Sequence, residues 1–187
     1  GEAVAASGNV EEQECPYDES PNISITNSSF YDNYARYFLV YVDSGKLTIS
    51  NSNIYKNEGG GLALIMTGCT DVKMTGAKIY ENKISSIFNL GINDNLDVES
   101  SEIYSNTAAW NGTFILNFGG DATIIDSDIH DNTTIEDGGA VYYSDGDFTS
   151  TDTCWSNNSP EDVYHETTAE SYNFECSNFT CDATGCR

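Results

Sequence analysis

A four-residue word that ends in asparagine recurs six times along this chain and constrains its fold more than any other feature. Each copy consists of an apolar residue, an aromatic residue, a variable residue and Asn. The six copies are Phe30–Asn33, Ile54–Asn57, Ile79–Asn82, Ile103–Asn106, Ile129–Asn132 and Cys154–Asn157. The spacing from Asn to Asn is 24, 25, 24, 26 and 25 residues. A fixed period of this length is typical of stacked structural repeats that share one core.

Each repeat reads as short β-strands joined by turns. A segment of alternating apolar and polar residues precedes the Asn word, as in Leu47–Ser50, and a second apolar run follows it, as in Phe114–Phe118. Ser, Asn, Asp and Gly separate these runs, and no stretch shows the i, i+3, i+4, i+7 stripe of an amphipathic helix. We therefore predict an all-β chain with three strands per repeat, stacked as a parallel β-helix solenoid of about six coils of 24–26 residues.

The repeats also resemble a known group. The chain is similar to the right-handed parallel β-helices of the pectin-lyase-like superfamily, and its repeats resemble those of the polymorphic outer-membrane proteins. The marks of those repeats are Phe-x-x-Asn, matched by Phe30 and Asn33, and Gly-Gly-Ala-Ile, matched by 138–141 and loosely by 60–63. The resemblance covers about residues 22–158 and implies a right-handed coil. It leaves function open, because this scaffold carries lyases, hydrolases, adhesins and structural rods.

We expect three regions along the chain. Residues 1–21 would form an N-terminal cap or assembly segment, residues 22–158 the β-helix, and residues 159–187 a Cys-rich C-terminal cap. The six cysteines are Cys15, Cys69, Cys154, Cys176, Cys181 and Cys186. The number of cysteines is even, and the last four lie close together near the C-terminus, which favours disulfides. Cys15–Cys69 is one possible pair, since six cysteines can be connected in many ways. A zinc site is the rival interpretation, but no Cys-x-x-Cys pair is present and His165 stands alone.

Secretion is indicated by the cysteines and, independently, by acceptor motifs for N-linked glycans. Six Asn-x-Ser/Thr motifs occur, at Asn22, Asn27, Asn111, Asn132, Asn157 and Asn178. Asn132 and Asn157 also belong to the recurring Asn words, so an inward-facing ladder of asparagines would make them poor acceptors. No apolar stretch approaches the ~18 residues that a membrane span needs, so we expect no membrane insertion.

The chain is strongly acidic, with 30 Asp and Glu against 7 Lys and Arg and a net charge of −23. This charge excludes nucleic acid as a partner, because phosphate binding needs clustered basic residues. We expect no cofactor, and the one ion that the acidic turns could hold is calcium, which prefers oxygen ligands. The candidate ligands are Asp71, Asp94, Asp121 and Asp147.

Nothing in the chain predicts catalysis. A lyase of this superfamily would need an arginine beside its calcium-binding aspartates, and the only arginines are Arg36 and Arg187. The sequence words of polygalacturonase-like hydrolases are absent. Carboxylate pairs such as Asp97 with Glu99, or Asp126 with Asp128, are explained equally well by a solvated surface. We therefore expect a protein that is not an enzyme.

An aromatic row occupies the second position of the Asn word. Its members are Tyr31, Tyr55, Tyr80, Tyr104, His130 and Trp155. Each follows an inward apolar residue, so by alternation we expect the row to face outward. Two interpretations stay open: the rings stabilise the stack through mutual contacts, or they bind sugar rings or a neighbouring chain.

The long strand reads as apolar on both sides, which is typical of a sheet covered on both faces. We expect its outward residues to form an interface, namely Leu39, Tyr41, Ile65, Ile87, Ile115, Val141 and Tyr143. The sequence thus predicts a secreted structural or adhesion protein that packs against itself or a sister protein to build a surface layer or filament. The alternative is a carbohydrate-binding or polysaccharide-degrading β-helix that uses the aromatic row and the acidic turns.

Overall fold

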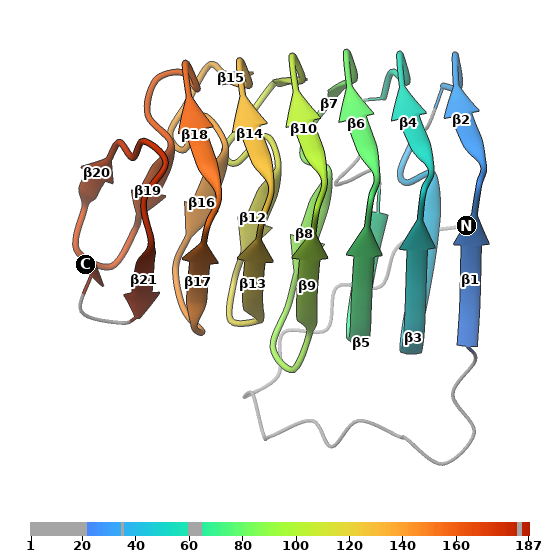
Figure 1. The fold of residues 1–187 in the computed structure, drawn as a ribbon, viewed down its shortest axis with the longest axis horizontal. Coiled ribbons are helices and arrows are strands. Elements are labelled where there is room, and N and C mark those ends of the chain that lie inside the picture. Colours follow the sequence, from blue (N-terminus) through green and yellow to red (C-terminus); the bar gives the residue numbers. More distant parts are fainter. Residues whose placement is uncertain (1–21, 35, 60–64, 183–184) are drawn as a thin grey trace.

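The protein is a stack of similar coils arranged side by side along one axis (Figure 1). The computed structural model describes residues 22–34, 36–59, 65–182 and 185–187. These residues form strands, turns and bends and contain no helix. The strands belong to three sheets, which run along the stack, and nearly all neighbouring strands are parallel. The predicted all-β solenoid is confirmed.

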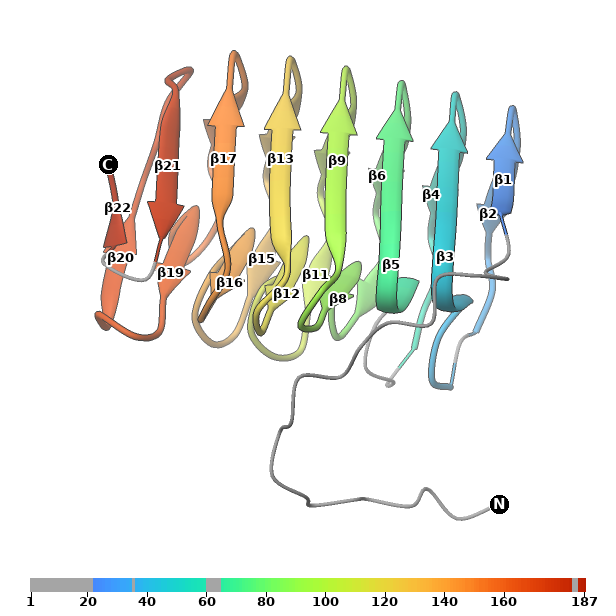
Figure 2. The ribbon, with the colours of Figure 1, turned by 90° about the horizontal axis from the view of Figure 1, so that it is seen from below.

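The first sheet carries the long strands and is the largest, with 13 strands among the described residues. Its strands are β1 (Asn22–Thr26), β3 (Val40–Ser50), β5 (Ile65–Thr75), β8 (Phe88–Leu90), β9 (Asn95–Glu99), β12 (Ile115–Asn117), β13 (Asp121–Ile125), β16 (Val141–Tyr143), β17 (Phe148–Thr151), β19 (Val163–His165), β20 (Glu170–Tyr172), β21 (Phe179–Asp182) and β22 (Gly185–Cys186). Figure 2 shows β1, β3, β5, β9, β13 and β17 as a row, with β1 last at one end.

The second sheet is built from the Asn words. It contains β2 (Ser29–Tyr31), β4 (Asn53–Tyr55), β6 (Lys78–Tyr80), β10 (Glu102–Tyr104), β14 (Asp128–His130) and β18 (Cys154–Ser156). The third sheet is short and contains β7 (Lys83–Ile84), β11 (Thr107–Ala108) and β15 (Thr133–Thr134). Each coil therefore contributes one strand to the second sheet, and equivalent residues of successive coils lie directly above one another.

Stacked apolar side chains fill the interior. In the second sheet, Ile54, Ile79, Ile103 and Ile129 pair in register and are fully buried. In the first sheet, alternate residues such as Leu47 and Val72 are buried, whereas their polar neighbours face solvent. This alternation is the one that the sequence predicts for half-buried strands, and it produces one continuous core along the axis.

An asparagine ladder runs along the interior corner after the second sheet. We use this name for Asn33, Asn57, Asn82, Asn106, Asn132 and Asn158. The Oδ1 atom of Asn82 accepts hydrogen bonds from the backbone N–H and the Nδ2 of Asn57, both over 3.0 Å. Its Nδ2 donates to Ile54 O and to Asn106 Oδ1. Each interior Asn thus ties three coils together while leaving no buried amide unpaired.

Two bends in each coil use the left-handed backbone region. One lies inside the Asn word, at Lys56, Glu81 and the equivalent positions, and the other lies between the first and second sheets, at Asn51 and Gly76, for example. A φ near +50° is uncommon for residues other than glycine, and Asn and Asp adopt it most readily. These bends explain why turn-forming residues recur with the same period as the Asn word.

The C-terminal region closes one end of the stack. The parallel stacking continues to β19, which pairs with β16, and then β20 and β21 add to the first sheet in antiparallel orientation. Disulfides join Cys154 to Cys176 and Cys181 to Cys186. The expected disulfide-rich cap is therefore present at this end.

Candidate functional site

The aromatic row is a continuous stack of parallel rings. Ring centroids lie 5.1 Å apart for Tyr31–Tyr55, 4.9 Å for Tyr55–Tyr80, 5.0 Å for Tyr80–Tyr104 and 5.1 Å for Tyr104–His130, with planes inclined by at most 10°. The rings point outward and are partly exposed, as the alternation predicts. Their faces cover one another, so only ring edges meet solvent along most of the row.

His130 ends this stack and has a specific polar partner. Its Nδ1 lies 2.7 Å from Asp131 Oδ2, and this hydrogen bond lowers the pKa of the Asp131 carboxyl below its usual value. Both side chains are at the surface, and no nucleophile or second base adjoins them among the hydrogen bonds of the described residues. The pair therefore reads as a structural end to the row.

Trp155 does not belong to the aromatic row, contrary to the prediction. It pairs with Ile129 and is 2% exposed, so it occupies the inward column, and Ser156 stands beside His130. In the last coil, each residue of the Asn word thus occupies the position that the preceding residue of the word occupies in the other coils. For the same reason Asn158, and not Asn157, accepts the hydrogen bond from Asn132 Nδ2. Asn157 is exposed and lies outside the asparagine ladder.

The predicted apolar interface is wrong for five of its seven residues. Ile65, Ile87, Ile115, Val141 and Tyr143 are all fully buried in the core. Leu39 is half-buried, and Tyr41 is exposed as expected. The strands β5 and β12 therefore face the opposite way from the prediction, and β16 is buried on both sides. In β8 the predicted inward residues Phe88 and Leu90 are buried as expected, and Ile87 is buried in the corner that precedes this strand.

The reason for this error is the variable connection between the asparagine ladder and the long strand. Val40, Ile65, Phe88 and Ile115 form one inward column. They follow their ladder asparagines by 7, 8, 6 and 9 residues, respectively. Because an odd change in length reverses the side-chain alternation, the phase of one coil cannot be carried to the next. Consecutive buried residues in the corners, such as Ile87 and Phe88, further break the alternation.

The proposed calcium ligands are not brought together. Asp71 and Asp121 lie on the outer edge of the first sheet, separated by Asn95, and Asp121 Oδ1 accepts the N–H of Asp147 over 2.8 Å. Asp94 instead turns inward and accepts hydrogen bonds from Gly91 N–H and Thr70 N–H. Over the described ranges, no group of three or more His, Cys, Asp or Glu side chains is arranged to hold a metal ion.

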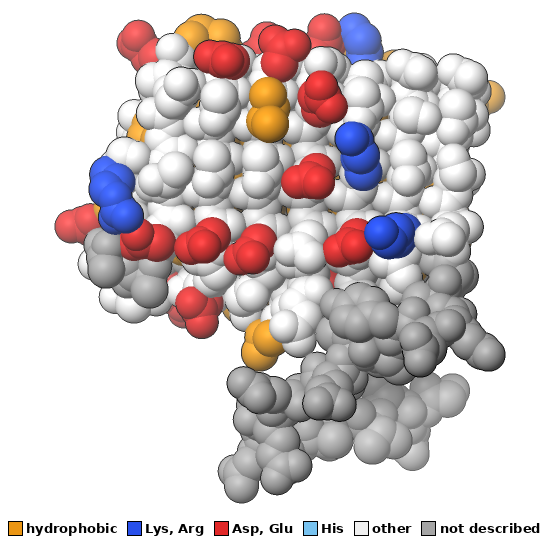
Figure 3. Space-filling view, turned by 60° about the horizontal axis from the view of Figure 1, so that its bottom comes forward, with side chains coloured by type: hydrophobic (Ala, Val, Ile, Leu, Met, Phe, Trp, Pro, Cys, Tyr) orange, Lys and Arg blue, Asp and Glu red, His pale blue; other side chains and the backbone are white. Residues whose placement is uncertain are grey.

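On the outer faces of the first and second sheets, lysine side chains form ion pairs with acidic side chains of the next coil. Lys46 lies 3.6 Å from Asp71 on the next coil, and on the second sheet Lys78 lies 2.7 Å from Glu102. Figure 3 shows acidic side chains across this face, with the lysines toward its N-terminal side. A shallow groove of about 490 Å³ lies there between rows of Lys, Thr and Asp side chains, including Lys73 and Asp97.

The carboxylate pairs considered for glycoside chemistry lie on open surface. Asp97 and Glu99 are exposed on β9, and Asp126 and Asp128 are exposed at the corner between β13 and β14. None of these four carboxyl groups lies in an enclosed cleft that would hold a bound sugar.

The glycan acceptors differ in accessibility. Asn132 is fully buried, and its Nδ2 donates to Ile103 O and Asn158 Oδ1, so this amide cannot carry a sugar in the folded chain. The exposed acceptors are Asn22, Asn27, Asn157 and Asn178, and Asn111 is half-buried. Glycosylation itself stays a prediction.

The remaining cysteine prediction is only partly within the described residues. Cys69 is disulfide-bonded, whereas Cys15 and the whole segment 1–21 lie outside them. Disulfides of this kind are typical of an oxidising, extracellular environment. In the part of the chain that the structure describes, no helix is long and apolar enough to cross a membrane.

Comparison with known proteins agrees with this geometry. A family model described as the right-handed β-helix region matches residues 15–113, which is more than half of the chain. The chain belongs to the right-handed β-helix family. The expected likeness to the pectin-lyase-like superfamily fits this result, whereas likeness to the polymorphic outer-membrane repeats stays a prediction. No curated protein and no solved structure gave a significant match.

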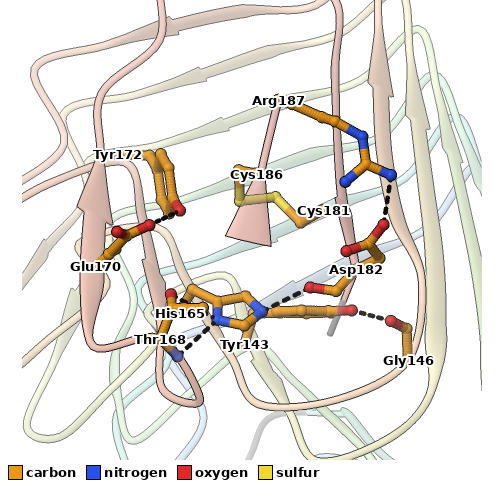
Figure 4. Close-up of a disulfide and its surroundings, with 10 residues drawn as sticks. All are labelled: Tyr143, Gly146, His165, Thr168, Glu170, Tyr172, Cys181, Asp182, Cys186 and Arg187. Carbon is orange, nitrogen blue, oxygen red and sulfur yellow. Dashed lines mark hydrogen bonds and ion pairs between the residues drawn. A yellow bond between two sulfur atoms is a disulfide. The ribbon is translucent and has the colours of Figure 1, made fainter. Parts of the chain in front are cut away.

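The two ends of this right-handed β-helix differ. At the C-terminal end, Phe148, Trp155 and Phe179 are buried beneath the cap. Figure 4 shows part of this closure, where His165 Nε2 donates to Asp182 O over 2.8 Å and Nδ1 accepts from Thr168. The imidazole is buried and fully hydrogen-bonded, which is consistent with a structural role and leaves no free nitrogen for zinc.

At the N-terminal end of the β-helix, no described residue covers the first coil. The inward residues Ile23, Ile25 and Phe30 are only partly buried, although their counterparts in the next coil, such as Leu47 and Ile49, have no exposed surface. Around this end lie the exposed aromatic residues Tyr31, Tyr34, Tyr37, Phe38 and Tyr41, of which Tyr34 is 76% exposed. We call these five residues the N-terminal aromatic cluster.

Sequence reasoning missed the N-terminal aromatic cluster as a candidate site. The available signal was the density of aromatic residues, because five of the 11 residues from Tyr31 to Tyr41 are Tyr or Phe. These residues lie in the first coil that the structure describes and at the start of β3, where their side chains are exposed.

Proposed function

We propose that this chain is a secreted, non-catalytic β-helix that works by assembly, and that its open N-terminal end is the contact surface. The earlier expectation of an apolar outer sheet face is replaced here, because those residues form the core. The observation that carries the proposal is the contrast between the two ends: one is sealed by the cap and the other exposes core residues and the N-terminal aromatic cluster.

Exposed aromatic side chains support an assembly role on energetic grounds. Tyr and Phe are enriched in the contact regions of interfaces, and the rings of Phe38 and Tyr41 adjoin each other with centroids 5.0 Å apart. The outer face of the first sheet, in contrast, carries mainly polar and charged side chains, such as Thr48, Lys73 and Asp97. A contact that buries apolar surface is therefore favoured at the N-terminal end.

Carbohydrate binding through the aromatic row is less well supported. Sugar binding uses the face of an aromatic ring, and the faces of Tyr55, Tyr80 and Tyr104 are each covered by neighbouring rings. Among the described residues, the two ends of the row each have one face that no ring covers: Tyr31, which belongs to the N-terminal aromatic cluster, and His130, which adjoins Ser156.

The test is the mass of the secreted protein in solution, measured by sedimentation and by electron microscopy. The double variant Tyr37→Ser with Phe38→Ser is expected to lose the assembled species because it removes exposed apolar surface at the N-terminal end. Ile135→Ser is the control, since Ile135 is also an exposed apolar residue, at 79% against 60% for Tyr37 and 42% for Phe38, but follows β15. Monomers alone in the unmodified protein, or loss of assembly in the control, would contradict the proposal.

A further inference from the structure

Among the described residues, one edge of β1 has no neighbouring strand. Asn27 N–H donates to Ser50 O over 3.0 Å, toward β3. Because N–H directions alternate along a strand, the N–H groups of Ile23 and Ile25 also point toward β3, and those of Ser24 and Thr26 point away. Within the described residues, no strand pairs with β1 on that side. The edge therefore offers hydrogen bonds to another strand.

The inward side chains of β1 are less buried than those of the strand beside it. Ile23 and Ile25 point inward from β1 and pair in register with the fully buried Leu47 and Ile49 of β3. Both isoleucines remain half-buried, and none of the residues that the structure describes pairs with them on the other side. A strand that pairs with β1 and brings apolar side chains to this face would continue the core by one layer.

The opposite end of the molecule ends the first sheet with β20 and β22, but its core residues are already covered. There, β21 covers β17 in antiparallel orientation, and the Cys154–Cys176 disulfide ties the cap to β18. Phe179 and Trp155 are buried beneath it. A head-to-tail contact between copies would therefore place a finished, polar cap against an open apolar edge. A head-to-head contact places two open edges together.

We propose that two copies of this chain join head to head, with β1 of one copy paired antiparallel to β1 of the other. The inference rests on the proposed function, since it names the partner that the N-terminal end accepts. A two-fold axis perpendicular to β1 at Ser24 sets Ser24 opposite Ser24 and Ile23 opposite Ile25 of the second copy. The outward-pointing N–H groups of Ser24 and Thr26 then receive partners, and the isoleucines of both copies meet.

The distribution of charge favours this orientation. Residues 84–186 contain 19 Asp and Glu and no Lys or Arg, whereas residues 1–83 contain 11 Asp and Glu and 6 Lys and Arg. Head-to-head pairing brings the less acidic halves together and keeps the two strongly acidic halves far apart. The contact should therefore strengthen as salt screens the remaining repulsion.

The test uses the full chain produced in a bacterial periplasm, which forms disulfides without attaching N-linked glycans. Ser24→Pro removes the outward-pointing N–H at the centre of the contact, and proline is tolerated on an edge strand where its nitrogen faces solvent. Ser24→Ala keeps the N–H and is the matched control, because both changes remove the same hydroxyl. Sedimentation equilibrium over a dilution series reports mass, and circular dichroism reports folding.

The expected result is a dimer for the unmodified chain and for Ser24→Ala, and a folded monomer for Ser24→Pro. A Ser24→Pro protein that still forms dimers or larger assemblies would overturn the β1 pairing while leaving the proposed assembly function intact. An unmodified chain that stays monomeric at every concentration and salt would overturn both. If Ser24→Pro loses its β signal, Thr26→Pro tests the same edge one hydrogen bond away.

Discussion

Asn158 donates a hydrogen bond from Nδ2 to Asp162 Oδ1 over 2.7 Å, so a buried carboxylate accepts the last bond of the asparagine ladder. The other oxygen of Asp162 accepts the N–H of Phe174, also over 2.7 Å. One side chain thus closes the ladder and holds the C-terminal segment against the last coil. At the other end, Asn33 Oδ1 has no donor among the described residues, which matches the open state of that end.

The asparagine ladder should contribute strongly to stability in the middle of the stack. Asn82→Ala removes two donors and one acceptor and leaves the N–H of Asn57 and the carbonyl of Ile54 unpaired in the interior. Unsatisfied buried groups cost about 1–3 kcal/mol each, so we expect the free energy of unfolding to fall by about 3 kcal/mol. Asn33→Ala, at the exposed end, is the control and should cost less than about 1 kcal/mol. Equal losses in urea denaturation would contradict this role.

The buried carboxyls of the cap should make stability depend on pH. Burial raises the pKa of Glu161 above 4.5 and that of Asp162 above 3.8, their ordinary values. The folded chain therefore binds these protons more tightly than the unfolded chain. Its stability is highest below the ordinary values and falls as the pH rises through the raised ones.

The variant Glu161→Gln isolates this effect. It keeps an oxygen to accept the N–H of Gly138 and removes the titrating proton. We expect the decrease in unfolding free energy from acid toward neutral pH to be smaller than in the unmodified protein. Glu99→Gln, on the exposed face of β9, changes the net charge equally and should leave the slope nearly unchanged. Identical slopes for the two variants would assign the pH dependence to net charge alone.

The orientation of the long strands can be tested with neighbouring residues. Ile115 is fully buried in the inward column, whereas Leu116 on the same strand is half-exposed. Ile115→Lys should abolish the cooperative unfolding transition, because a buried unpaired charge costs several kcal/mol and adjacent coils share the core. Leu116→Lys should remain folded and lose no more than about 1 kcal/mol. The reverse pattern in circular dichroism melting would show that the strand faces the other way.

Glycan occupancy gives a test that is independent of stability. In protein from a glycosylating host, peptide mass spectrometry should find Asn132 unmodified, because its amide is buried and hydrogen-bonded on both sides. Asn157 carries the same kind of acceptor motif but is exposed, so it serves as the control and is expected to be modified. A glycan on Asn132 in folded protein would contradict the inward orientation of the ladder.

Periodicity alone predicted the coil, because the features that repeat are those that stack. The Asn word, the inward isoleucines and the tyrosine row each follow from a fixed spacing between residues within one strand and its adjoining turn. Prediction failed where spacing changes. The connection that leads to Ile65 or Ile115 differs in length from coil to coil, so alternation could not be carried across it.

The last coil shows the same limit on a smaller scale. The aromatic side chain of Trp155 and the amide of Asn157 satisfied the word in sequence, yet the fold uses them one position out of phase. A second asparagine at 158 let the ladder continue after this shift. The exposure of Ile23, Ile25 and Phe30 could not be predicted from the repeat, because the equivalent residues of later coils are buried.

The asparagine ladder also gives the molecule a direction. In every side-chain to side-chain hydrogen bond of the ladder, the Nδ2 of one asparagine donates to an Oδ1 in the next coil toward the C-terminus. The ladder therefore begins with a donor, Asn33, and ends on an acceptor, the carboxylate of Asp162. Inserting or deleting one whole repeat between Asn57 and Asn106 would preserve every link and leave both ends as they are. The length of the protein can thus change during evolution in steps of one coil, without any compensating change at the cap or at the open edge.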